Sequence, residues 1–143
     1  MKDLIDILHD GNHSLVVANG EVCTFDGGGV SDLYRLLQED PGFLHGASVA
    51  DKVVGKAAAS LMVLAKIKEA YAEVVSQPAL DLLRSSGISV IYAKVVPCII
   101  NRAGTGLCPL ETRCMTCMTP EECFVAIRTF MQEIKHETER NDK

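Results

Sequence analysis

Three charged side chains lie close together in an otherwise small and apolar stretch, GASVADKVVGKAAASLMVL (residues 46–64). They are Asp51, Lys52 and Lys56. Two nearby lysines can attract a phosphate or a carboxylate, and Gly55 would let such an anion approach the backbone closely. Asp51 could orient Lys52 or accept a hydrogen bond from a hydroxyl, and Lys52 could instead act as the nucleophilic amine of an enzyme. Asp51 and Lys52 are therefore the candidate catalytic residues.

An ordinary structural role accounts for the same residues. Asp51 would cap a helix that begins between Asp51 and Gly55, the two lysines would be solvated, and Gly55 would permit close packing of that helix on a strand. The segment GKAAAS lacks the earlier glycine and the Gly-Lys-Ser/Thr ending of a P-loop, which excludes nucleotide triphosphate hydrolysis. The choice between a ligand site and a structural role stays open.

Two other segments supply candidate ligand-binding residues. The glycines after Asp26 precede a helix that Ser31 can cap, and such a helix start favours anions. The segment INRAGTGL follows the last predicted strand, and its arginine suits planar anions. In the alternative interpretation its asparagine stabilises a turn and its arginine pairs with Glu111. The candidate ligand-binding residues are Gly28, Gly29, Ser31, Lys52, Gly55, Lys56, Asn101 and Arg102.

Four cysteines have the spacing C-x5-C-x2-C-x5-C, at Cys108, Cys114, Cys117 and Cys123. Thiolates at this spacing can bind zinc or an iron–sulfur cluster within one compact loop. Alternatively, Cys114 and Cys117 form a redox-active pair whose thiol pKa is lowered by a nearby helix N-terminus. In the third interpretation the thiols are inert, and Cys123 joins the apolar face of the last helix.

The elements that must position these residues follow from the hydrophobic pattern. Apolar residues in the first ten positions suit a short helix, and Asn19-Gly20 divides two β-rich runs, which predicts a hairpin. Further strands are predicted at residues 46–50, 70–76 and 88–96, and further helices from about Ser31, Gly55, Pro78 and Pro120. The residues between Cys98 and Cys117 are expected to form a loop.

The alternation of these later strands and helices predicts right-handed crossovers and parallel strands. The fold class is thus α/β, a three-layer α/β/α sandwich around a five-stranded mixed sheet. We expect an α/β domain at residues 1–107, with a cysteine-rich loop and C-terminal helix at 108–143 packed on the same domain.

Composition narrows the possible partners. The 143 residues carry a formal net charge of −5 and a pI near 5.3, with no cluster of lysine and arginine, so nucleic acid is not an expected partner. Aspartates interrupt the N-terminal residues where a secretory signal would need an apolar core, and no run approaches the length of a membrane span. We therefore expect a cytoplasmic protein with no membrane partner.

The order of elements, together with VADKVVGKAAA (residues 49–59), the PALDLL helix and INRAGTGLCPLE (residues 100–111), resembles the bacterial family called domain of unknown function 1893. The likeness runs from the first helix to Glu111. It implies a cytidine-deaminase-like fold with strand order 2-1-3-4-5 and a homo-oligomer, and it implies no established activity.

The resemblance also shows what this chain lacks. Deaminases of this fold hold zinc with a His or Cys and two further cysteines, and a Glu moves protons. The corresponding stretches here, GGGVSD (residues 27–32) and ADKVVGK (residues 50–56), contain no His, Cys or Glu. We expect no deaminase zinc site and no deaminase activity.

Three function classes follow. The leading hypothesis is a non-zinc, deaminase-fold protein that binds a small anionic ligand, such as a nucleotide or a phosphorylated metabolite. The alternatives are a lysine-dependent enzyme using Lys52, and a metal, iron–sulfur or thiol-redox protein using the C-terminal cysteines.

Overall fold

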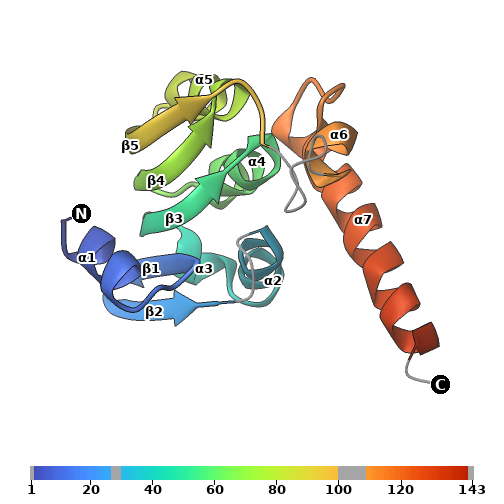
Figure 1. Cartoon of the computed structure of the whole chain (residues 1–143), viewed down its shortest axis with the longest axis horizontal. Coiled ribbons are helices and arrows are strands. Elements are labelled where there is room, and N and C mark those ends of the chain that lie inside the picture. Colours follow the sequence, from blue (N-terminus) through green and yellow to red (C-terminus); the bar gives the residue numbers. More distant parts are fainter. Residues whose placement is uncertain (1, 27–29, 100–108, 142–143) are drawn as a thin grey trace.

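The computed structural model describes residues 2–26, 30–99 and 109–141 (Figure 1). Its helices and strands, in chain order, are α1 (Lys2–Asp10), β1 (Leu15–Asn19), β2 (Glu21–Phe25), α2 (Val30–Glu39), α3 (Pro41–Leu44), β3 (Ser48–Val54), α4 (Lys56–Ala65), β4 (Glu69–Ser76), α5 (Gln77–Ser85), β5 (Ser89–Val96), α6 (Pro109–Cys114) and α7 (Pro120–Asn141).

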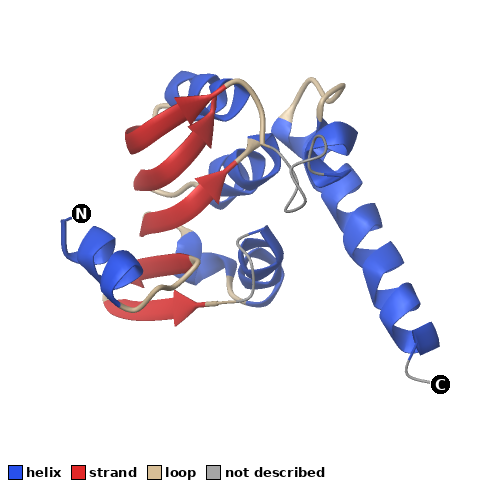
Figure 2. Cartoon of the chain, in the orientation of Figure 1, coloured by secondary structure: helices blue, strands red, loops and turns tan. Residues whose placement is uncertain are grey.

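The strands form one mixed sheet in the order β2-β1-β3-β4-β5 (Figure 2), the order that the family resemblance implies. β1 runs antiparallel to β2 and β3, whereas β3, β4 and β5 are parallel. The predicted hairpin is confirmed. Gly20 turns the chain between β1 and β2 at a φ of +83°, which only glycine adopts without strain.

The two faces of the sheet are covered unequally. One face carries the larger apolar core, to which α2, α4, α5, α6 and α7 all contribute buried or partly buried side chains. On the other face α1 buries Leu4 and Leu8 against Val16, Ala50 and Tyr71. These apolar positions of α1 recur on one side of the helix, which is why so short a segment forms a stable layer there.

The helix predicted from about Gly55 is confirmed as α4, but the strand before it was predicted to end at Ala50, whereas β3 continues to Val54. Val53 and Val54 pair with Val74 and Val75 of β4. β-branched residues favour this extended pairing over the alanine-rich helix that follows. Gly55 is the last residue before α4, with extended backbone angles, so Asp51 does not cap the helix.

Two short helices occur where none was predicted. α3 and α6 each begin with a proline, whose fixed φ suits a first helical position. α6 therefore replaces part of the loop that was expected between Cys98 and Cys117. Ser31 lies inside the first turn of α2, not before it, because that helix already begins at Val30.

The residues after position 107 share the main core with the rest of the chain. Leu110, Cys114, Cys123 and Ile127 are buried in the same apolar cluster as Leu61 of α4. The division between residues 107 and 108 stays a prediction. Within the described ranges, no helix is both long and apolar enough to cross a membrane.

Candidate functional site

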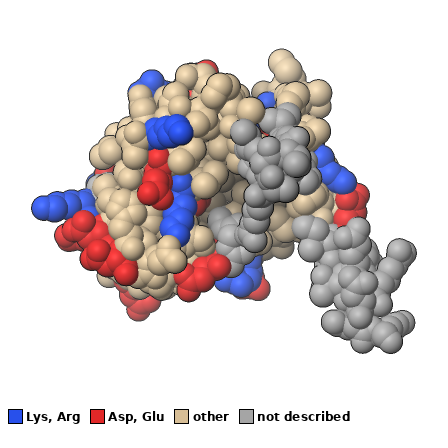
Figure 3. Space-filling model, in the orientation of Figure 1, with Lys and Arg blue, Asp and Glu red and all other residues tan. Residues whose placement is uncertain are grey.

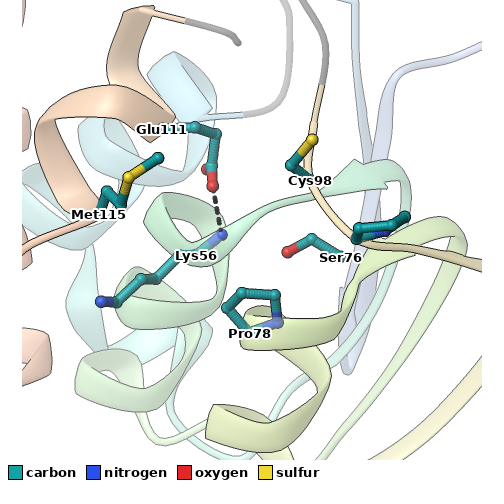
Figure 4. Close-up of a pocket in the computed structure, with 7 residues that line it drawn as sticks. Lys56, Ser76, Pro78, Cys98, Glu111 and Met115 are labelled. Carbon is teal, nitrogen blue, oxygen red and sulfur yellow. Dashed lines mark hydrogen bonds between the residues drawn. The ribbon is translucent and has the colours of Figure 1, made fainter.

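The start of α4 holds the carboxylate of Glu111, a residue of α6. The backbone N–H of Lys56 donates to Glu111 Oε2 at 3.0 Å (Figure 4), and the N–H of Ala57 donates to Oε1 at 3.1 Å. These N–H groups have no partner within the helix, and the helix dipole favours a negative charge beside them. α4 therefore begins at an occupied anion site.

Gly55 makes this contact possible. A Cβ atom at this position would lie 2.2 Å from Glu111 Oε1 and 2.5 Å from its carboxyl carbon, closer than van der Waals contact permits. The carboxylate of Glu111 thus approaches the backbone at the glycine where the sequence predicts that a ligand anion could approach it. The occupant is a side chain of the same protein, and ligand binding at Gly55 stays a prediction.

The two lysines that the sequence groups together point to different places. Lys56 Nζ donates to the backbone oxygen of Cys117 at 2.5 Å. Lys52 Nζ donates to Asn12 Oδ1, in the turn after α1, at 2.6 Å. Alternate residues of a strand share one face of a sheet, and Ala50 packs against α1. Lys52 therefore lies on the α1 face, whereas Lys56 lies at the start of α4.

A small pocket adjoins the Glu111 contact at the carboxyl ends of β4 and β5. Its volume is about 130 Å³. In Figure 4, Glu111 descends from α6 toward the start of α4, with Ser76, Pro78 and Cys98 across the pocket. Ligands of open α/β sheets commonly bind at this edge. The lining residues are Lys56, Ser76, Pro78, Pro97, Cys98, Glu111 and Met115.

A second polar feature lies within the core, where Asp51 of β3 faces Asp32 in the first turn of α2. Asp51 is 1 % exposed, and its Oδ2 has no hydrogen-bond partner among the described residues. Burial raises the pKa of Asp51 to about 7; backbone N–H groups of Val53 and Lys52 oppose this rise, and the charge of Asp32 adds to it. Asp32 is itself buried and 3.3 Å from Arg35.

Three of the four predicted cysteine ligands come together between α6 and the first turn of α7. Cys123 lies close enough to Cys114 and Cys117 to affect the pKa of both thiols, and Cys114 and Cys123 are fully buried. Burial, followed by the neighbouring Cys123, raises the pKa of both Cys114 and Cys117. This direction is opposite to the lowered thiol pKa that the redox hypothesis expects, and desolvation by burial is its largest cause.

Cys108 lies outside the described residues. Within the part of the chain that the structure describes, no group of three His, Cys, Asp or Glu side chains is arranged to hold a metal ion. The zinc or iron–sulfur site stays a prediction.

The family of the chain can now be stated. The family described as "Domain of unknown function (DUF1893)" matches residues 3–131, which include the Glu111 contact, the Asp32–Asp51 pair and all four cysteines. The chain belongs to the DUF1893 family.

A solved structure agrees with this assignment. The crystal structure of a DUF1893 family protein from Thermotoga maritima is similar to this chain with a TM-score of 0.81 and 29% identity, over 92% of this chain and 88% of the other. No curated protein matches.

The DUF1893 chain thus places its predicted site residues in three groups. Gly55 and Lys56 lie at the Glu111 contact, Lys52 lies on the opposite face, and Ser31 is exposed at the start of α2. Four other candidates, Gly28, Gly29, Asn101 and Arg102, lie outside the described residues. Two contributors were missed as site residues, Glu111 and Asp32; each is far along the chain from its partner, so no local pattern could reveal them.

Charged side chains of both signs are intermixed on the molecular face shown in Figure 3. On the face that Figure 3 shows, lysine and arginine side chains lie among aspartates and glutamates instead of forming one basic area.

Proposed function

We propose that this DUF1893 protein binds a small anionic ligand, such as the phosphate of a nucleotide or of a phosphorylated metabolite, at the start of α4. The ligand takes the place of the Glu111 carboxylate. One observation carries the proposal: the N–H groups of Lys56 and Ala57 already hold an anion over Gly55.

Exchange of one anion for another is chemically reasonable at this position. If Glu111 simply left, two buried or partly buried N–H groups would lose their acceptor, at a cost of about 1–3 kcal/mol each. A phosphate or carboxylate that arrives at the same time would supply the missing acceptors and meet the same helix dipole. Lys56 is the residue directly after Gly55. Its ammonium group could turn away from the backbone oxygen of Cys117 and toward the ligand.

The size of the neighbouring pocket limits what can enter. At about 130 Å³ it is smaller than the sites of roughly 300–1,000 Å³ that enclose drug-sized ligands. It therefore suits a small anion, or the anionic end of a larger molecule whose remainder stays outside. The exposed Cys98 and the apolar Pro78 and Pro97 would contact that end.

The cytidine-deaminase-like identity of the fold is part of this proposal, and the strand order β2-β1-β3-β4-β5 supports it. The stretches that correspond to deaminase zinc ligands, residues 27–32 and 50–56, contain no His, Cys or Glu. This composition supports a binding protein that is not a zinc-dependent deaminase.

Calorimetric titration with inorganic phosphate and with adenosine monophosphate tests the exchange. Glu111→Ala removes the competing carboxylate, so its affinity for phosphate should exceed that of the parent by about tenfold, or about 1.4 kcal/mol. Glu39→Ala removes the same charge from an exposed position at the end of α2 and should bind like the parent. Equal phosphate affinity in the parent and in Glu111→Ala would refute the proposed exchange.

A second candidate is an enzyme that uses Asp51 in acid–base chemistry. A buried carboxyl whose pKa rises to about 7 can both hold and release a proton near neutral pH. Lys52 would not join it, because its side chain lies on the other face of the sheet. Loss of a measured turnover in Asp51→Asn, with turnover kept in Lys52→Met, would favour this candidate over a pure binding function.

A further inference from the structure

We propose that two copies of this chain associate through β5, whose free edges pair antiparallel and continue the sheet from one copy into the other. The inference goes beyond the proposed ligand function and concerns a different part of the molecule. It specifies the surface for the homo-oligomer that the sequence leads us to expect.

β5 is an edge strand, and among the described strands its second side has no partner. It pairs with β4 only, over eight residues from Ser89 to Val96. In Figure 1 it lies at the end of the sheet farthest from β2. The backbone N–H and C=O groups along its free side need partners, and an extended strand is the partner that satisfies them in order.

The side chains of this strand are unusually apolar for a solvated edge. Ile91 is 53% exposed, Tyr92 39% and Val95 38%. Lys94 is the only charged residue of β5. Natural edge strands that remain monomeric are commonly protected by several charges, a proline or a bulge, so this composition favours an edge that is covered by another chain.

The sequence of β5 is complementary to itself in one register. When two copies pair antiparallel about Ala93, Ile91 of each copy lies opposite Val95 of the other, which makes two apolar cross-strand pairs. Tyr92 then lies opposite Lys94, where an ammonium group can approach the aromatic ring. Ala93 meets its own copy at the axis with a small side chain. A register centred on Lys94 would instead oppose two like charges, which is unfavourable.

The other edge of the sheet is a poorer candidate. β2 has five residues, begins with a glutamate and carries Val22 as its large exposed apolar side chain, at 52%. Pairing of β5 with β2 of another copy would also repeat without closing and would produce filaments, whereas β5 with β5 closes into a two-fold dimer. The occupant of the β5 edge is therefore a second copy of the same strand.

Sedimentation of the full chain over a range of concentrations tests this dimer. The parent should be a dimer, and the double variant Ile91→Lys and Val95→Lys should dissociate with a Kd weaker by at least about tenfold. The side chains of Ile91 and Val95 are both exposed. The far-ultraviolet circular dichroism and the melting temperature of the double variant should therefore stay close to those of the parent.

Val22→Lys is the control, because it places a lysine at an exposed apolar position on the opposite edge of the sheet. It should remain a dimer. A monomeric parent at submillimolar concentration, a dimer that survives the β5 double variant, or a dimer that dissociates in Val22→Lys would each contradict the proposal. A second readout is amide hydrogen exchange: residues 91–95 should exchange more slowly as the protein concentration rises.

Discussion

Asp51 and Lys52 are adjacent in the chain, yet their side chains serve opposite faces of the sheet. The Asp51 carboxyl is buried near Asp32 of α2, whereas Lys52 Nζ donates to Asn12 in the turn after α1. The two charged side chains are thus neighbours in the sequence but lie at separate sites in the fold. Substitutions at the two positions should therefore have independent effects on stability and on binding.

Asp51→Asn should change how stability depends on pH. The folded-state pKa of Asp51 is about 7, raised from 3.8 by burial. Between these two values the unfolded chain releases the proton while the folded chain keeps it, so the free energy of unfolding falls as pH rises. Asparagine does not titrate. The variant should gain stability relative to the parent between about pH 4 and about pH 8, by up to roughly 4 kcal/mol.

Urea unfolding of both proteins across this pH range measures the difference. Lys52→Met is the control, because it changes a neighbouring charge on the other face and should leave the pH dependence unaltered. A stability difference between Asp51→Asn and the parent that stays constant from acid to alkaline pH would show that this carboxyl keeps an ordinary pKa.

The two lysines should differ in phosphate binding. Lys56 begins α4 beside the Glu111 contact, so Lys56→Met should weaken phosphate binding in the Glu111→Ala background by about tenfold. Lys52→Met in the same background should bind like Glu111→Ala alone, because Lys52 lies on the other face. Calorimetric titration of the three variants measures this. Equal losses from both substitutions would place the anion elsewhere.

Local signals predicted much of this fold. Asn19-Gly20 indicated the hairpin, and Pro120 indicated the start of α7. There, Thr119 Oγ1 accepts from the Glu122 N–H at 3.2 Å, and the Glu122 carboxylate accepts from the Met118 N–H at 2.6 Å. Caps and turns depend on residues a few positions apart, so their chemistry is visible in the sequence.

The site depends on contacts that no local pattern contains. Glu111 reaches Lys56 across 55 positions of chain, and Asp32 influences Asp51 only because α2 and β3 contribute to the same core. The end of β3 was misplaced for a related reason: pairing with β4 extends the strand through Val54, although the following alanines favour a helix. Where tertiary contacts decide the conformation, residue type alone is a weak guide.

Gly55→Ala should destabilise the protein through Glu111. The added Cβ would lie 2.2 Å from Glu111 Oε1, so the carboxylate must leave the N–H groups of Lys56 and Ala57. We expect the free energy of unfolding to fall by about 1–3 kcal/mol. In the Glu111→Ala background the same substitution should be nearly neutral, because the clash is gone. Denaturant unfolding of the two single variants and the double variant gives the coupling between the positions.

Gly42→Ala is the matched control for that cycle. Gly42 lies in α3, and the nearest atom to a Cβ there is 4.0 Å away, so alanine should be neutral or slightly stabilising. A loss of stability in Gly55→Ala that persists in full without Glu111 would mean that the backbone, and not the carboxylate, requires glycine at this position.

The thiols should react with an alkylating reagent in an order set by burial. Cys98 is exposed, whereas Cys114 and Cys123 are fully buried and burial raises the pKa of Cys114. Only the thiolate attacks such reagents, so Cys98 should be labelled quickly in the folded protein and Cys114 only on unfolding. Mass spectrometry of peptides after timed labelling follows each site, with Cys98→Ser as the control for the fast phase.

Rapid labelling of Cys114 in the folded chain would favour the redox hypothesis. If Cys114 is protected together with bound zinc or iron in protein purified without oxygen, the metal interpretation would replace that of inert core thiols.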